Sequence, residues 1–116
     1  MTVALQVKSS VVANRDREVH VLVAEGELDI ATLGTLQAKL DALVDGTGRR
    51  LLLDLSALEF LDSPGIAVLY QASASFAHLA IVVAAGSRVA RVLEVCGMET
   101  ILPIFHSRAD AVRALE

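Results

Sequence analysis

Short aliphatic runs alternate along this chain with segments whose apolar residues recur at helical spacing. Residues 51–55 and 79–85 are largely apolar runs of the kind that form strands covered on both faces. In residues 33–44, by contrast, the spacing of the leucines predicts a helix with one buried face. Strands and helices that follow one another through short connections predict an α/β fold with a largely parallel central sheet.

The pattern fits a single domain of residues 1–116, because a chain of this length is too short for two typical domains. Strands are expected at residues 3–11, 19–24, 51–55, 79–85 and 102–105, and helices at residues 33–44, 63–76, 88–96 and 108–115. A tight turn near residues 14–17 should make the first two strands antiparallel. Pro103 predicts that the last strand lies at a sheet edge. The expected fold is therefore a mixed sheet of about five strands packed with about four helices.

Residues that start or end helices support these boundaries. Side chains that can accept a bond from a first-turn amide precede the helices: Asp29 or Thr32, Ser63, Ser87 and Ser107. Glycines that can end a helix follow the first and the third: Gly46, Gly48 and Gly97. Ser107 together with Asp110 also resembles a capping box.

The high hydrophobicity of the chain does not indicate a membrane protein. Hydrophobic residues make up 54% of the chain and the mean hydropathy is +0.58. The longest uninterrupted apolar stretch, however, is about seven residues, whereas a membrane-spanning helix needs about 20. Residues 1–14 have neither the basic region nor the apolar core of a signal peptide. We therefore expect a cytoplasmic domain without membrane insertion.

Charge and cysteine content exclude further classes of function. The net charge is −4, so the chain lacks the cationic surface on which sequence-independent nucleic-acid binding depends. The single cysteine, Cys96, cannot form an internal disulfide, and its helical spacing predicts a small buried side chain. The three histidines and this cysteine show no metal-ligand spacing. No nucleic acid, metal or cofactor is expected.

The most informative segment is Asp62-Ser63-Pro64-Gly65, which follows an apolar run and opens the second helix. Ser63 can cap the helix, and Pro64 suits the first helical position, where a missing amide hydrogen costs nothing. Gly65 leaves room for another surface to approach the backbone, and Asp62 places a carboxylate beside the positive end of the helix. By themselves these features describe a well-capped helix.

Several segments of the chain also share their residues with one known family. The matching stretches are Gly26-Glu27-Leu28-Asp29, residues 52–55, Phe60 to Ile66, residues 92–98, and residues 104–107. They resemble the G-x-L-D and D-S-x-G motifs and the helix and strand endings of the STAS domain. The resemblance is closest to the stand-alone anti-sigma factor antagonist (anti-anti-sigma factor) family of bacteria and covers nearly the whole chain.

This resemblance implies a phosphorylation switch rather than an enzyme. In the family, the serine of D-S-x-G, here Ser63, is phosphorylated by the anti-sigma factor, a serine kinase that supplies ATP and magnesium. The unphosphorylated protein binds the anti-sigma factor and frees the sigma factor, and a serine phosphatase restores this form. Asp29 matches the aspartate of G-x-L-D, which lies near the phosphosite. At the start of a helix the dipole should tolerate a phosphate, so the modification should act on the surface.

The expected partner-binding residues are Asp29, Ser63, Gly65, Ile66 and Leu69. Of these, Ile66 and Leu69 also fit a core-facing position, as Tyr70 does, whereas Pro64 and Gly65 are expected to be exposed.

Two alternatives remain beside the switch. Pro64 and Ala67 replace residues that are commonly small or glycine in the family, and the proline restricts the backbone around Ser63. If this restriction prevents phosphorylation of Ser63, the chain would be an accessory or scaffold subunit that is not phosphorylated. Such a subunit would belong to a lipid-transport complex or a stress-signalling assembly. An enzyme with Ser63 as nucleophile is disfavoured, because the chain has no G-x-S-x-G elbow and no histidine in a recognisable triad position.

Overall fold

The computed structural model describes residues 4–14, 17–44 and 49–116. In chain order the strands are β1 (Gln6–Asn14), β2 (Arg17–Leu28), β3 (Arg50–Asp54), β4 (Leu58–Leu61), β5 (His78–Val82) and β6 (Ile104–Phe105). The helices are α1 (Leu33–Leu43), α2 (Ser63–Ser75), α3 (Arg88–Val95) and α4 (Arg108–Ala114), with a short 3-10 helix, η1 (Met98–Thr100), after α3.

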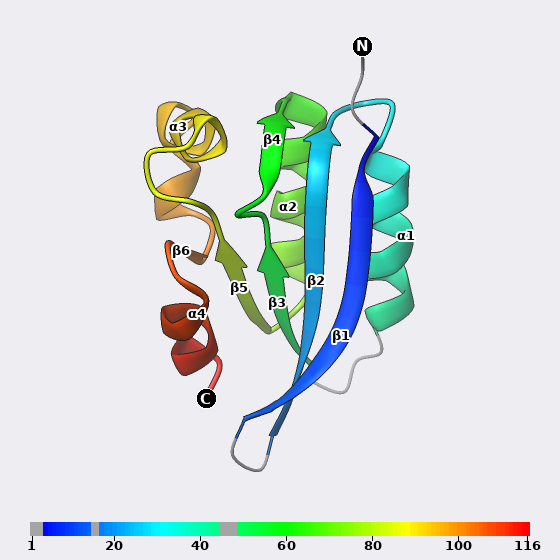
Figure 1. The fold of residues 1–116 in the computed structure, drawn as a ribbon, viewed down its shortest axis with the longest axis vertical. Helices are drawn as coiled ribbons and strands as arrows, with labels where there is room; N and C mark the ends of the chain where they lie inside the picture. Colours follow the sequence, from blue (N-terminus) through cyan, green and yellow to red (C-terminus); the bar gives the residue numbers. More distant parts are fainter. Residues whose placement is uncertain (1–3, 15–16, 45–48) are drawn as a thin grey trace.

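The strands form one mixed sheet in the order β1-β2-β3-β5-β6 (Figure 1). Among the described strands, β1 and β2 pair antiparallel, as the tight turn predicted, and the other pairs are parallel. The long strand β2 has two partners on the same side: its first half pairs with β3 and its last residues pair with β4. The prediction of a mixed sheet is therefore confirmed, and β4 is an additional strand that the sequence patterns did not reveal.

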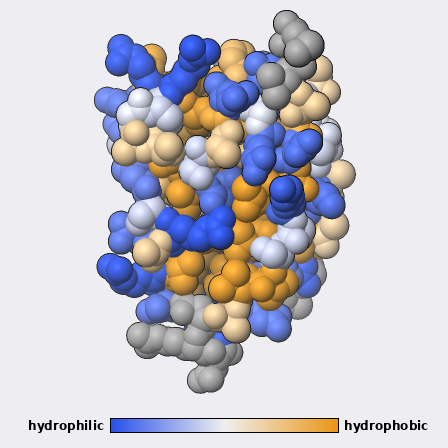
Figure 2. All heavy atoms as spheres, viewed as in Figure 1, coloured by the Kyte–Doolittle hydropathy of each residue, from blue (hydrophilic) through white to orange (hydrophobic). Residues whose placement is uncertain are grey.

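Both faces of the sheet are covered, as the apolar runs predicted. Leu51 and Leu53 of β3 lie in the larger core cluster, which includes residues of α1, α2 and α3. Leu52 points to the opposite face, where it packs with Ala111 of α4 and with Leu115, which follows that helix. This alternation is the strand geometry of successive side chains pointing to opposite faces. On the face that carries α4, apolar side chains remain visible between polar ones (Figure 2).

Most predicted boundaries agree with the structure. The Ser87 and Ser107 hydroxyls each accept a bond at 3.1 Å from the backbone N–H three residues later, which confirms both caps. Gly97 follows α3 with φ of +72°, a left-handed conformation that favours glycine. The last strand, β6, lies at the sheet edge, as Pro103 indicated. The proposed helix-ending residues Gly46 and Gly48 lie outside the described residues.

The structure corrects the expected start of the first strand and the expected burial of Cys96. The first strand begins at Gln6 rather than residue 3. Cys96 is exposed rather than buried, because it caps the C-terminus of α3, beyond the buried side chains of Val89 and Leu93.

Within the described residues, none of the helices combines the length and apolar character that a membrane crossing requires.

Candidate functional site

The pairing of β2 with β4 brings together the two motifs that the sequence singled out. Leu28, the last residue of β2, pairs with Leu61, the last residue of β4. Because the two strands are parallel, the residues that follow them, Asp29 and Asp62, leave the sheet at the same edge. The Asp62 backbone N–H also donates to the Leu28 carbonyl oxygen at 3.4 Å. The start of α2 is thus anchored beside the loop that leads into α1.

Asp62, and not Ser63, caps α2, so the predicted capping role of Ser63 was wrong. The Asp62 backbone is extended, and its Oδ1 accepts a bond from the Gly65 N–H at 3.1 Å. Asp62 fulfils the same geometric requirement as a serine cap and adds a negative charge at the positive helix end. Ser63 and Pro64 are therefore the first and second residues of the helix, whereas Ser63 was expected as the cap and Pro64 at the first helical position.

This shift leaves the Ser63 hydroxyl unused by the fold. Ser63 is exposed, and among the residues that the structure describes its side chain has no hydrogen-bond partner. A serine that capped its helix would have had its oxygen committed to a backbone amide. The Ser63 hydroxyl is instead available for binding or modification by another molecule.

Asp29 shapes the loop between β2 and α1 rather than capping α1 directly. Its Oδ1 accepts bonds from the Ala31 N–H at 2.9 Å and the Thr32 N–H at 3.1 Å. Thr32 occupies the N-cap position of α1, but its hydroxyl donates backward to the Glu27 carbonyl oxygen at 2.7 Å. The carboxylate of Asp29 therefore stabilises a tight turn and remains partly exposed beside the start of α2.

The glycine of the D-S-P-G segment is buried, contrary to the expectation that it is exposed. A Cβ on Gly65 would lie 2.8 Å from Leu61 Cδ1 and 3.0 Å from both the Cγ and the carbonyl oxygen of Leu28. The surface that approaches this backbone is thus the molecule's own sheet. Gly65 permits α2 to start close to β2 and β4, and it offers no contact surface to a partner.

The remaining predicted binding residues divide between core and surface. Leu69 is fully buried, so it belongs to the core, and Ile66 is partly buried. Tyr70 was expected in the core but is 53% exposed, because it lies on the outer side of α2. Sequence reasoning also missed Ile30, which is 73% exposed in the same loop as Asp29. The position of an apolar residue directly after the G-x-L-D motif is the sequence feature that could have indicated Ile30 as a candidate binding residue.

A second polar cluster joins the end of β3 to α4. Asp54 is the one buried charged residue in the described part of the chain, and its Oδ2 pairs with the Arg108 guanidinium at 2.6 Å. Its Oδ1 accepts bonds from the Ser56 N–H at 2.9 Å and the Ser56 hydroxyl at 2.7 Å. Burial raises the pKa of Asp54, but the bonds from Ser56 and Arg108 outweigh this effect and hold the pKa below its ordinary value.

The lowered pKa of Asp54 predicts a pH-dependent contribution to stability. This contribution is complete above the ordinary carboxyl pKa and is lost as the pH falls through the lowered pKa of the folded state. Asp54→Asn should lower the free energy of unfolding by about 1–3 kcal/mol at pH 7 and by much less near pH 2. Urea unfolding across this pH range measures the difference.

The exposed Asp110, whose carboxylate lies 3.6 Å from Arg113, provides a matched control for this substitution. Asp110→Asn should change the free energy of unfolding by less than about 1 kcal/mol at every pH, because exposed ion pairs contribute little. A loss in Asp54→Asn that stays constant from pH 7 to pH 2 would contradict the assignment.

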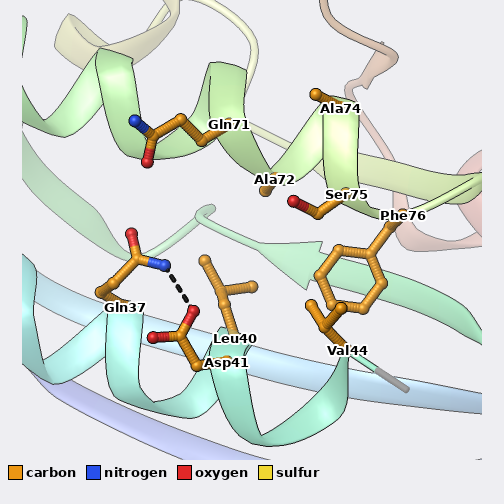
Figure 3. Close-up of a pocket in the computed structure, with 9 residues that line it drawn as sticks. All are labelled: Gln37, Leu40, Asp41, Val44, Gln71, Ala72, Ala74, Ser75 and Phe76. Atoms are coloured by element: carbon orange, nitrogen blue, oxygen red, sulfur yellow. Dashed lines mark hydrogen bonds between the residues drawn. The ribbon is translucent and has the colours of Figure 1, made fainter. Parts of the chain in front are cut away.

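A surface hollow of about 350 Å³ lies between α1 and α2 (Figure 3). It is lined by Gln37, Leu40, Asp41, Val44 and residues of the C-terminal half of α2. Gln37 Nε2 donates to Asp41 Oδ1 at 2.8 Å within it. This hollow is far along α2 from Ser63, and none of the predicted site residues lines it. The described residues also contain no group of three His, Cys, Asp or Glu side chains that could hold a metal ion.

Comparison with known proteins identifies relatives along most of the chain. The STAS domain family matches residues 10–111. An anti-sigma-F factor antagonist of Mycobacterium tuberculosis, RsfB, is 32% identical over 96 residues, which are 81% of this chain and 79% of the relative.

Solved structures of similar fold include two anti-sigma factor antagonists. An antagonist from Mycobacterium paratuberculosis superposes with a TM-score of 0.78 at 24% identity, covering 95% of this chain and 94% of that one. The Bacillus cell fate determinant SpoIIAA in its phosphorylated form gives a TM-score of 0.62 at 18% identity, covering 97% of this chain and 100% of that one. At these identities the similarity establishes the fold.

Proposed function

This chain belongs to the STAS domain family, and on that premise we propose that it is an anti-sigma factor antagonist regulated at Ser63. In this proposal the unphosphorylated protein binds an anti-sigma factor and thereby releases a sigma factor. Phosphorylation of Ser63 ends the binding. The observation that carries the proposal is the exposed Ser63 hydroxyl at the start of α2, which no other described residue engages.

The proposed partners follow from the resemblance of the D-S-P-G segment to the phosphorylated motif of the family. The described residues offer no cluster of ligands for a metal ion, and the sequence has no phosphate-binding glycine loop. In this proposal the anti-sigma factor acts as a serine kinase and supplies the nucleotide and magnesium. A serine phosphatase would remove the phosphate. We place both reactions in the cytoplasm, where sigma factors act, and we assign no catalytic role to this chain.

The proposed binding surface surrounds Ser63. It comprises Asp29 and Ile30 from the loop before α1, together with Ser63, the partly buried Ile66 and the exposed Tyr70 from α2. Exposed apolar and aromatic side chains beside polar ones are typical of the centre of an interface. Gly65 and Leu69 contribute indirectly, because they set the position of α2 against the sheet.

Mass spectrometry after incubation with an anti-sigma factor kinase and ATP tests the proposal. The wild-type protein should acquire one phosphate at Ser63, and Ser63→Ala should acquire none while still binding the kinase. Ser87 provides the matched control, since it also stands at a helix start but its hydroxyl caps α3. Ser87→Ala should be phosphorylated at Ser63 like the wild type.

Two results would contradict the proposal. Phosphate at another residue would remove Ser63 from the switch. Tight binding of the kinase without any phosphorylation would favour the alternative of a STAS scaffold subunit that is not phosphorylated.

A further inference from the structure

The backbone amides at the start of α2 are almost all engaged or absent. A helix leaves about four N–H groups without partners at its N-terminus, and these groups commonly bind phosphate. Here the Asp62 N–H donates to the Leu28 carbonyl oxygen, and the Gly65 N–H donates to the Asp62 carboxylate. Pro64 has no N–H. Of these groups at the start of α2, which lies within the described part of the chain, the N–H of Ser63 is the one left without an acceptor.

The segments that meet at this site carry only acidic charges. Residues 26–38 and 58–75 contain no lysine or arginine, and the two carboxylates that directly follow the paired ends of β2 and β4 are those of Asp29 and Asp62. The helix end offers little compensation, because its partial positive charge resides on N–H groups without partners. A phosphate at Ser63 would therefore enter an acidic environment with at most one backbone donor.

We propose that Pro64, together with the Asp62 cap, prevents the start of α2 from binding a phosphate on Ser63, so that the phosphate charge stays uncompensated and faces the partner. Pro64 acts by withholding a backbone donor and does not itself hold the phosphate. An alanine at this position would supply the missing N–H at the second helical residue, next to the modified serine. The inference deepens the proposed function, because it assumes that Ser63 is the residue that carries the phosphate.

Phosphoserine inserted at position 63 during translation tests this inference without any kinase. A ³¹P NMR titration measures the second pKa of the phosphate, which is about 6 for phosphoserine. In the otherwise wild-type protein this pKa should equal or exceed the value for the same protein unfolded in urea. In Pro64→Ala it should fall by about half a unit, because a new N–H stabilises the dianion.

Amide chemical shifts give a second readout that a merely structural effect of the proline would not produce. In Pro64→Ala, the new amide of residue 64 should move downfield when Ser63 carries phosphate. Pro103→Ala changes the other proline of the chain, at the β6 edge of the sheet, and should leave the phosphate pKa unchanged.

Three outcomes would overturn the inference. The first is a phosphate pKa well below that of the unfolded chain in the folded protein that retains Pro64. The second is an unchanged phosphate pKa in Pro64→Ala. The third concerns Arg88 and Arg91, which are exposed on α3, the helix packed against β4. A rise of the phosphate pKa in Arg88→Ala or Arg91→Ala would show that an arginine neutralises the phosphate. Because the phosphoserine is inserted directly, none of these results depends on whether a kinase modifies Ser63.

Discussion

A single phosphate on Ser63 is expected to weaken the binding of an anti-sigma factor roughly a thousandfold. The phosphate adds a charge of about −1.5 to −2 beside the carboxylates of Asp62 and Asp29, which leave the sheet at the same edge. Its burial against a partner, or its placement opposite like charges, costs several kcal/mol. A loss of about 4 kcal/mol corresponds to the thousandfold change in Kd.

Isothermal titration calorimetry with phosphoserine at position 63 measures this effect. Ser63→Ala should still bind, and Ser63→Asp should bind with intermediate affinity, because one carboxylate carries less charge than a phosphate. Phosphoserine at position 75 is the matched control, since Ser75 is exposed at the opposite end of the same helix. An equal loss of affinity for phosphate at positions 63 and 75 would attribute the effect to net charge rather than to the site.

Gly65→Val is expected to lower the free energy of unfolding by about 3 kcal/mol. Even the first carbon of a side chain at this position would lie 3.0 Å or less from Leu61 and Leu28. One of these contacts is the Leu28 carbonyl oxygen, which belongs to the backbone of β2 and cannot rotate away. The start of α2 would have to move outward, and it would carry Ser63 with it.

Chemical denaturation of Gly65→Val and Gly34→Val measures this effect against a matched control. Gly34 also lies in the first turn of a helix, α1, but a Cβ there would meet no atom within 4 Å. Gly34→Val should change stability by less than about 1 kcal/mol. Equal stability losses in the two variants would show that the substitution acts through helix propensity rather than through the contact with the sheet.

The sequence predicted those parts of the fold that depend on local chemistry. The runs around Leu52 and Ile81 indicated strands covered on both faces, and these strands lie in the centre of the sheet. The Ser87 and Ser107 caps were also predictable, because each side chain bonds to an amide only three residues away. Such interactions need no knowledge of the rest of the chain.

The features that the sequence did not reveal depend on contacts between distant segments. β4 is only four residues long, and its strand character comes from pairing with β2. The burial of Gly65 likewise depends on Leu28, which is remote in sequence. The pair of Asp54 with Arg108 joins residues 54 positions apart.

The start of α2 was harder to predict for a different reason. Asp62 and Ser63 are adjacent and both can cap a helix, so local chemistry alone could not choose between them. The structure selects Asp62, whose N–H is held by the Leu28 carbonyl oxygen. The choice matters for function, because it frees the hydroxyl of the serine that we propose as the phosphosite.

The release of a sigma factor from its preformed complex with the anti-sigma factor tests the central claim most directly. Unmodified protein, added in increasing amounts to a fluorescently labelled complex, should displace the sigma factor. Protein with phosphoserine at position 63 should displace none at the same concentrations. No release by the unmodified protein, or equal release by both forms, would contradict the account.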